Sequence, residues 1–238
     1  MKKIKSNEIV TNKLVKTDAK LYGYIPDKAR DVANKICTII NASEADEGGI
    51  ISVVGPQSSG KSLVGMELIE KFDGKELKIV AAQPKADRSD VPEGKLFSRV
   101  GYEIPAVSFQ TKKEIEKIFH CNDIVVIDEI QFTPTSLQSY LLKEMRMFKD
   151  RGGWTIVLGL LYTSLGTEFL ISSVLKDEAS ALFQLKSTCQ MCGRRNAIYN
   201  QRLVKGKPAA NTAPDLMPPS SDVIYEPRCQ DCYVVVGE

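Results

Sequence analysis

The residues best suited to chemistry form one short run, Gly55-Pro56-Gln57-Ser58-Ser59-Gly60-Lys61-Ser62. This is the GxxxxGK[ST] spacing of a phosphate loop, in which backbone N–H groups surround a polyphosphate. In such a loop the lysine neutralises phosphate oxygens, and the last hydroxyl reaches Mg²⁺. An apolar run precedes the loop and a helical pattern follows it, so we predict phosphate and nucleotide binding. The alternative is a glycine-rich turn without a ligand.

Two adjacent carboxylates, Asp128 and Glu129, follow the apolar run 124–127. This is the form of a Walker B element, whose first carboxylate lies near Mg²⁺. A hydroxyl that attacks a γ-phosphoryl group needs a proton acceptor within hydrogen-bond reach, and Glu129 is the candidate for that base. The alternative is that the two acids only solvate the end of a strand.

Four of the six cysteines form two CxxC pairs, Cys189 with Cys192 and Cys229 with Cys232. Each pair places two sulfurs in one tight turn, and four thiolates suit tetrahedral Zn²⁺. We predict a structural zinc site, because four cysteines leave no open coordination position for catalysis. A redox pair or disulfides are the alternatives.

The segments that must position these residues alternate between strand and helix. Such alternation predicts an α/β fold with a largely parallel sheet and helices on both faces, and ligands then bind beyond the C-terminal ends of the strands. Expected strands span 50–54, 77–82, 102–107, 123–127 and 154–158, with 181–188 as a further candidate. Expected helices span 62–72, 112–119 and 135–151.

The chain divides into three predicted parts. These are a basic and helical extension (1–49), a nucleotide-binding α/β domain (50–186) and a small zinc-binding domain (187–238). In the extension, apolar residues at helical spacing follow Pro26, so we expect one packing helix behind a solvated basic tail. A docking or regulatory arm is the alternative.

Composition excludes several classes of protein. Of the 238 residues, 43% are hydrophobic and 26% charged, which is typical of a globular protein. The formal net charge of +2 is too small to indicate a nucleic-acid partner. No run of about 18 apolar residues occurs, and the chain starts with polar sequence, so we expect a cytoplasmic protein that does not bind a membrane.

The order and spacing of these blocks resemble the zinc-containing (type II) thymidine kinases. The resemblance covers roughly residues 50–236, and its most specific parts are Asp128-Glu129-Ile130-Gln131-Phe132 and Tyr225-Glu226-Pro227-Arg228-Cys229-Gln230-Asp231-Cys232-Tyr233. It implies phosphoryl transfer from ATP to the 5′-hydroxyl of thymidine or deoxyuridine, in pyrimidine salvage for DNA synthesis. It also implies ATP, Mg²⁺ and structural Zn²⁺ as cofactors, and a homotetramer.

The resemblance implies roles for individual residues. Glu129 would deprotonate the nucleoside, Ser62 and Asp87 would lie at Mg²⁺, and residues 216–224 would form a lasso over the base. The residues that would contact the nucleoside are Phe132, Phe169 and Tyr225. The residues that would bind ATP and its phosphates are Gly55, Pro56, Gln57, Ser58, Ser59, Gly60, Lys61, Ser62, Asp128 and Gln131.

The residues expected around the base depart from the family pattern. Gln57 stands where the family has a methionine that lines the thymine pocket, Leu161 replaces an aspartate, and Asn200 replaces a threonine. Ser220-Ser221 replaces a Gly-Gly pair in the lasso. Gain or loss of a hydrogen-bond partner changes substrate preference strongly. A kinase for a different or modified pyrimidine deoxynucleoside is therefore one alternative, and a catalytically inactive nucleotide-binding regulator is another.

Overall fold

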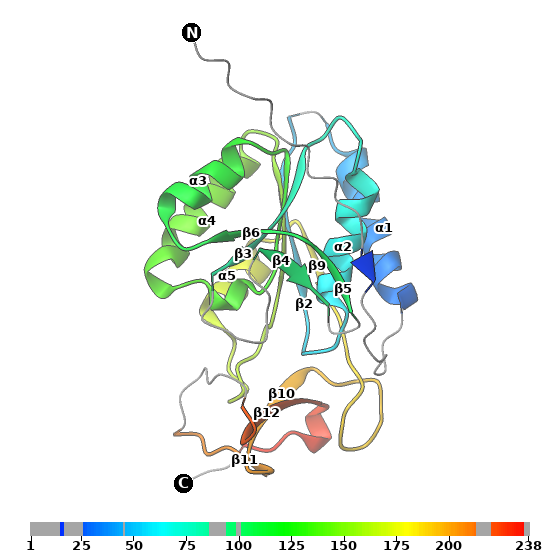
Figure 1. Ribbon diagram of the computed structural model, residues 1–238, viewed down its shortest axis with the longest axis vertical. Helices are drawn as coiled ribbons and strands as arrows, with labels where there is room; N and C mark the ends of the chain where they lie inside the picture. Colours follow the sequence, from blue (N-terminus) through cyan, green and yellow to red (C-terminus); the bar gives the residue numbers. More distant parts are fainter. Residues whose placement is uncertain are drawn as a thin grey trace.

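Figure 1 shows the computed structural model of the chain, which describes residues 15–16, 26–44, 46–85, 94–98, 101–212 and 220–235. Its centre is a six-stranded sheet in the order β6-β3-β7-β8-β2-β9, and all neighbouring strands are parallel. The predicted parallel sheet is therefore confirmed. Its strands are β2 (Gly49–Val54), β3 (Ile79–Pro84), β6 (Val107–Phe109), β7 (Ile124–Ile127), β8 (Trp154–Gly159) and β9 (Ala181–Gln184).

Helices cover both faces of this sheet (Figure 1). On one face lie α1 (Pro26–Ala42) and α2 (Lys61–Phe72), and on the other lie α3 (Lys112–His120), α4 (Thr135–Lys149) and α5 (Leu170–Glu178). Successive side chains of a strand point to opposite faces, so each strand feeds two hydrophobic cores. In β7, Ile124 and Val126 join the core under α1 and α2, while Val125 and Ile127 join the core under α3, α4 and α5.

Local sequence explains where the helices begin and what they bury. Thr111 and Glu114 form a capping box, in which Glu114 N donates to Thr111 Oγ1 at 3.3 Å and Thr111 N donates to Glu114 Oε2 at 3.0 Å. These bonds satisfy donors that the first turn of α3 leaves open. In α1 the predicted apolar stripe is buried against α2, which confirms the packing helix. The stripe consists of Ala29, Val32, Ala33, Ile36 and Ile40.

One expected strand, 102–107, is wrong in its extent. It splits into β5 (Tyr102–Pro105) and β6, and only β6 joins the parallel sheet. Instead, β5 pairs antiparallel with β4 (Lys95–Phe97) and β1 (Val15–Lys16). Pro105 lacks a backbone N–H and therefore suits the end of a strand. Helix α5 was not expected, because it is only nine residues long and its N-cap, Phe169, forms no side-chain cap hydrogen bond.

The C-terminal part forms a small antiparallel sheet beyond one end of the main sheet (Figure 1). Its order is β11-β10-β12, with β10 (Tyr199–Val204) between β11 (Lys207–Pro208) and β12 (Val223–Arg228). A short 3₁₀ helix, η2 (Gln230–Cys232), follows β12. In the part of the chain that the structure describes, no helix has both the length and the apolar character needed to cross a membrane.

Candidate active site and metal centre

The loop between β2 and α2 contains the predicted phosphate-binding residues, and its backbone is tightly folded. Gly60 has a φ of 93° and Ser58 a φ of 57°, both in the left-handed region. A Cβ atom at Gly55 would lie 2.7 Å from the backbone carbonyl oxygen of Leu185, so the loop has no room for a side chain there. The loop leads into the first turn of α2 at Lys61, where backbone N–H groups lack partners within the helix. This backbone can accommodate an anion.

The ammonium group of Lys61 folds back over this loop. Its Nζ atom donates to the carbonyl oxygens of Gly55 at 2.9 Å and Pro56 at 2.8 Å, and to Ser59 Oγ at 3.4 Å. Lys61 is only 8% exposed, and its charge also acts on Asp128. A buried cation held by carbonyl oxygens at a helix N-terminus can transfer its hydrogen bonds to a phosphate group.

Asp128 follows β7, in the middle of the sheet, and its carboxylate meets the first turn of α2. Its backbone N–H donates to the carbonyl oxygen of Ala82 at 2.9 Å, and the Ser62 hydroxyl donates to its carboxylate. Burial and the neighbouring charge of Glu129 raise the pKa of Asp128 to about 6, while Ser62 and Lys61 oppose this shift. The loop hydroxyl and the strand-end carboxylate are thus in direct contact, and such oxygen atoms are the ligands that Mg²⁺ prefers.

Glu129 turns away from the strand direction, because its backbone is left-handed with a φ of 52°. Its N–H donates to Asp128 Oδ1 at 2.8 Å, and its carboxylate accepts a hydrogen bond from Gln131 Nε2. Left-handed backbone is uncommon for a residue with a side chain and is often found at functional sites. The two adjacent acids therefore have different surroundings, with Asp128 buried beside Ser62 and Glu129 held by Gln131.

Gln131 is itself held by the residue that follows β8. It lies in the 3₁₀ helix η1 (Ile130–Phe132), and its Oε1 atom accepts the backbone N–H of Leu160 at 3.0 Å. Gly159 makes this approach possible, because a Cβ atom there would lie 2.5 Å from Ile130 Cγ2 and 2.8 Å from Gln131 Oε1. The amide of Gln131 orients Glu129, and its predicted role at ATP stays a prediction.

The three predicted nucleoside contacts lie on three separate elements. Phe132 ends η1, Phe169 caps α5, and Tyr225 lies in β12 of the small sheet, and all three are partly buried. Helix η1 packs next to α5, which brings the elements of Phe132 and Phe169 together. Asp87 lies outside the described residues, as do residues 216–219 of the predicted lasso. The roles predicted for Asp87 and for the lasso therefore stay predictions.

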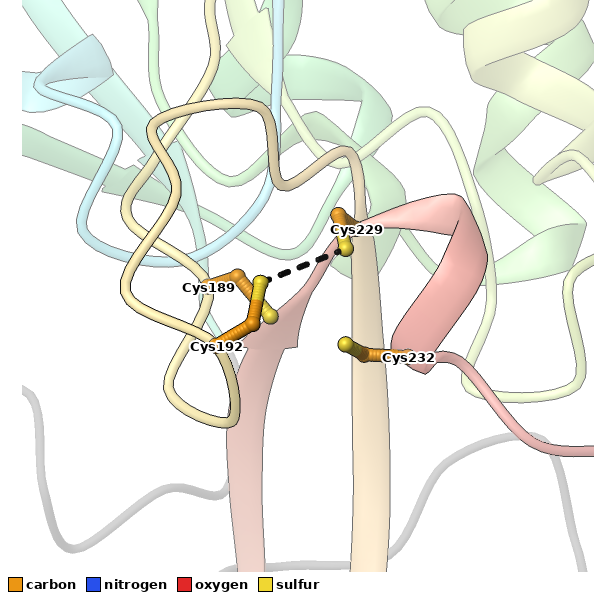
Figure 2. Close-up of side chains that lie close together, drawn as sticks. All are labelled: Cys189, Cys192, Cys229 and Cys232. Carbon is orange, nitrogen blue, oxygen red and sulfur yellow. Dashed lines mark hydrogen bonds between the residues drawn. The ribbon is translucent and has the colours of Figure 1, made fainter.

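The four paired cysteines converge in one cluster (Figure 2). Their sulfur atoms all lie within 4.8 Å of one another, and Cys192 Sγ lies 3.8 Å from Cys229 Sγ. Four sulfurs at about 2.3 Å from a tetrahedral Zn²⁺ are separated by about 3.8 Å, so the donor set and its spacing fit this ion. Cys189 and Cys229 are buried and Cys192 is exposed, and none of the four forms a disulfide. The cluster is compatible with structural zinc.

Charged groups around the cluster favour thiolate. Arg194 Nε donates to Cys192 Sγ at 3.4 Å, and this bond lowers the pKa of Cys192 to about 6. The same guanidinium group forms an ion pair with Asp231 at 2.6 Å, which joins the two CxxC turns. In contrast, the hydrogen bond between the Cys232 and Cys229 side chains raises the pKa of Cys232 to about 12. A bound Zn²⁺ would supply the positive charge that lets all four sulfurs ionise.

The C-terminal part also contacts the α/β part. Asn200 Oδ1 accepts the backbone N–H of Gln57 at 2.8 Å, and Ser187 Oγ donates to the carbonyl oxygen of Ser58 at 3.2 Å. Tyr199 packs between two other rings, with its centroid 4.9 Å from Tyr162 and 4.5 Å from Tyr233. The phosphate loop and the segment after β8 are therefore both held by the cysteine-containing part.

Comparison with known proteins identifies the family. The thymidine kinase family model matches residues 48–233, most of the chain. The chain belongs to the thymidine kinase family. This membership supports a nucleoside kinase function and implies the use of ATP.

Other comparisons add little to the thymidine kinase match. No curated protein matches the chain. Among solved structures, a match titled "Structure of C. elegans PCH-2" has 16% sequence identity and a TM-score of 0.40. It covers 68% of this chain and 43% of that one.

Three contacts of this thymidine kinase family member were missed by the sequence reasoning. The Gln131–Glu129 hydrogen bond links residues close in sequence, yet no periodicity or motif indicates which way the amide points. The Asn200–Gln57 and Ser187–Ser58 contacts each join residues more than 100 positions apart. One signal in the sequence pointed to the Asn200–Gln57 contact: Gln57 and Asn200 both depart from the family pattern.

Proposed function

We propose that this protein transfers the γ-phosphoryl group of ATP to the 5′-hydroxyl of thymidine or deoxyuridine. The observation that carries the proposal is the contact between Ser62 and Asp128 with Glu129 next to it, at the C-terminal edge of the sheet. A phosphate-binding loop, an oxygen pair for Mg²⁺ and a separately held carboxylate are the groups that this reaction needs. The family match supports the same chemistry.

ATP would bind with its phosphates at the loop between β2 and α2. The N–H groups at the start of α2 and the Lys61 ammonium would neutralise the phosphate oxygens. Ser62 and Asp128 would hold Mg²⁺, which supplies charge stabilisation at the transferred group, and Asp87 is proposed as a further group near it. The Asp128 carboxylate can bind Mg²⁺ at neutral pH without a further change of its pKa, because a pKa of about 6 leaves it mostly ionised there.

Glu129 would act as the general base. Its carboxylate takes the proton of the 5′-hydroxyl while the 5′ oxygen forms its bond to the γ-phosphorus and the bond from that phosphorus to the β,γ-bridging oxygen breaks. ADP leaves with the bridging oxygen, and the nucleoside becomes its 5′-monophosphate. Gln131 holds the carboxylate in one orientation, so the base is placed before the substrate arrives.

The nucleoside itself would lie between Glu129 and the small sheet. We propose that Phe132 and Phe169 pack against the pyrimidine ring, that Tyr225 contacts the nucleoside, and that residues 216–224 close over the base. We also propose that residues 1–49, 50–186 and 187–238 form three separate units of the chain. The protein would assemble as a homotetramer and lie in the cytoplasm. The separate antiparallel sheet and its cysteine cluster support a distinct C-terminal unit.

A nucleoside panel tests the proposal. The purified protein is incubated with ATP, Mg²⁺ and one of thymidine, deoxyuridine, deoxycytidine, deoxyadenosine or deoxyguanosine, and the monophosphate is measured by chromatography. We expect thymidine and deoxyuridine monophosphates and an equal amount of ADP. Binding of these nucleosides without any monophosphate would instead identify a catalytically inactive regulator.

A second candidate acceptor is a modified pyrimidine deoxynucleoside. The observation that favours it is Gln57 Oε1, which is buried and has no hydrogen-bond partner among the described residues. An unpaired buried acceptor costs about 1–3 kcal/mol, so a substrate that brings a hydrogen-bond donor to this atom gains affinity. Adding 5-hydroxymethyldeoxyuridine to the panel tests this candidate. A higher kcat/KM than that of thymidine would favour the modified acceptor.

A further inference from the structure

Asn200 forms the most direct link between the cysteine-containing part and the phosphate loop. It lies in β10 and is only 3% exposed, and its Oδ1 atom accepts the backbone N–H of Gln57 at 2.8 Å. A partly buried N–H group needs a partner, and here a side chain 143 positions away provides it. The second anchor, from Ser187 Oγ to the carbonyl oxygen of Ser58, holds the peptide group between Ser58 and Ser59.

Both anchors are attached to the metal-binding turns. Ser187 precedes Cys189 by two positions and is fixed by two backbone hydrogen bonds with Ala197, at 3.1 and 3.0 Å. Asn200 is paired across the β10–β12 ladder with Pro227, which precedes Cys229 by two positions. The carbonyl oxygen of Pro227 in turn accepts the N–H of Gln190, inside the first CxxC turn, at 2.9 Å. The segment of Ser187 and the β10–β12 ladder that carries Asn200 therefore both lead to the four-cysteine cluster.

We infer that Asn200 is a positioning residue through which the four-cysteine centre holds the phosphate loop in the shape that binds ATP. The inference rests on the proposed function, because it takes ATP as the ligand of that loop. Gln57 and Ser58 come directly before the residues whose N–H groups would face the phosphates. Fixing these two peptides therefore limits how far the rest of the loop can move. A bound metal would tie the first CxxC turn to the turn after β12, the strand that pairs with β10, and Asn200 would thereby be held against Gln57.

The first measurement is the affinity for ATP with Mg²⁺, determined by titration calorimetry without any nucleoside. We expect Asn200→Leu to weaken ATP binding about 5- to 10-fold, since one buried hydrogen bond is lost. Asn200→Ser, whose shorter side chain does not reach Gln57, should weaken it to a similar extent. Gln201→Leu is the matched control, because Gln201 is a buried amide of the same strand that bonds instead to the backbone of Val234. This control should lower the melting temperature and leave the ATP affinity within 2-fold of the wild type.

The second measurement repeats the titrations after removal of the metal with 1,10-phenanthroline, which leaves Mg²⁺ in solution. Metal removal should weaken ATP binding at least 5-fold in the wild type and in Gln201→Leu, but less than 2-fold further in Asn200→Leu and Asn200→Ser. A purely structural role for Asn200 predicts instead that metal removal acts equally in all four proteins, and that result would overturn the inference. Unchanged ATP affinity in both Asn200 variants would do the same.

These outcomes are distinct from failure of the proposed function. If the wild type binds no ATP, the proposed function and this inference are both wrong. If the wild type binds ATP and phosphorylates a nucleoside but the Asn200 variants bind ATP normally, only this inference is wrong. Should Asn200→Leu fail to fold, as shown by circular dichroism, Asn200→Ser decides the question.

Discussion

The side-chain amide of Gln131 joins the carboxylate of Glu129 to the backbone of Leu160, directly after β8. Its nitrogen donates to Glu129, and its oxygen accepts the N–H of Leu160 at 3.0 Å. Glu129 has a left-handed backbone, so the chain itself directs this carboxylate away from Asp128. The two adjacent acids therefore have different surroundings: Asp128 lies beside the loop hydroxyl, and Glu129 is held by Gln131.

Replacing Gln131 should impair turnover more strongly than ATP binding. Gln131→Leu removes the hydrogen bond that orients Glu129, and we expect kcat to fall about 10- to 100-fold, as misplaced catalytic groups do. Gln131→Glu places a second carboxylate beside Glu129, so the pH profile of kcat should shift to higher pH. Gln138→Leu is the control, because the Gln138 amide donates to the carbonyl oxygen of Thr133 and not to Glu129. Unchanged kcat in Gln131→Leu would contradict the role given to this amide.

Gly159→Ala tests the close approach of η1 to β8. The added Cβ atom would lie 2.5 Å from Ile130 Cγ2, so η1 must shift and carry Gln131 with it. We expect kcat to fall about 10-fold or more, because Glu129 loses its orientation. Steady-state kinetics and a crystal structure of the variant provide the check. Wild-type kcat together with an unmoved η1 would show that the site tolerates this change.

Asp128→Asn should stabilise the nucleotide-free protein near neutral pH while abolishing turnover. Burial and Glu129 raise the pKa of Asp128 from 3.8 to about 6, so the folded state binds this proton more tightly than the unfolded state. The resulting stabilisation is complete below about pH 4 and is lost as pH rises through 6. At pH 7.5 the neutral asparagine avoids this loss, and we expect a gain of roughly 1–3 kcal/mol in the free energy of unfolding.

Urea unfolding at pH 4 and pH 7.5 measures this difference. The control is Asp177→Asn, which changes an exposed carboxylate on α5 and should shift stability little at either pH. Equal effects of Asp128→Asn at both pH values would show that the charge of Asp128 is not the cause.

The cysteine cluster should hold one zinc ion per chain. Cys229→Ser replaces a fully buried ligand, and we expect loss of zinc and a fall in melting temperature of roughly 10 °C, because metal binding and folding of such a centre are linked. Cys121→Ser, at an exposed lone cysteine, should keep both at the wild-type values. Elemental analysis and thermal unfolding give the two readings. Full zinc content in Cys229→Ser would exclude the four-cysteine site.

Much of the fold follows from local sequence, because parallel strands buried on both faces leave continuous apolar runs. The runs before Gly55 and Asp128 are of this kind, and β2 and β7 appear within one residue of their expected bounds. The split at Pro105 could not be foreseen in the same way. Its two halves have similar local patterns, and only their tertiary partners assign β5 and β6 to different sheets.

The candidate site was predictable as a set of residues but not as a set of contacts. Motif spacing identified Lys61, Ser62, Asp128 and the cysteines, because backbone geometry within a short motif brings such groups to one ligand. The orientation of Glu129 depends on Leu160, directly after β8, and the loop anchor depends on Asn200 of another sheet. Contacts of this kind arise from packing, so they carry no local sequence signal.

The most direct test of the account compares the wild type with Glu129→Gln for ATP binding and for phosphorylation of thymidine. We expect the amide variant to bind ATP within about 2-fold of the wild type and to lose kcat by about 10²- to 10⁴-fold, the contribution of a general base. Thymidine phosphorylation at the wild-type rate by Glu129→Gln would contradict the assignment of Glu129 as the base that activates the nucleoside hydroxyl.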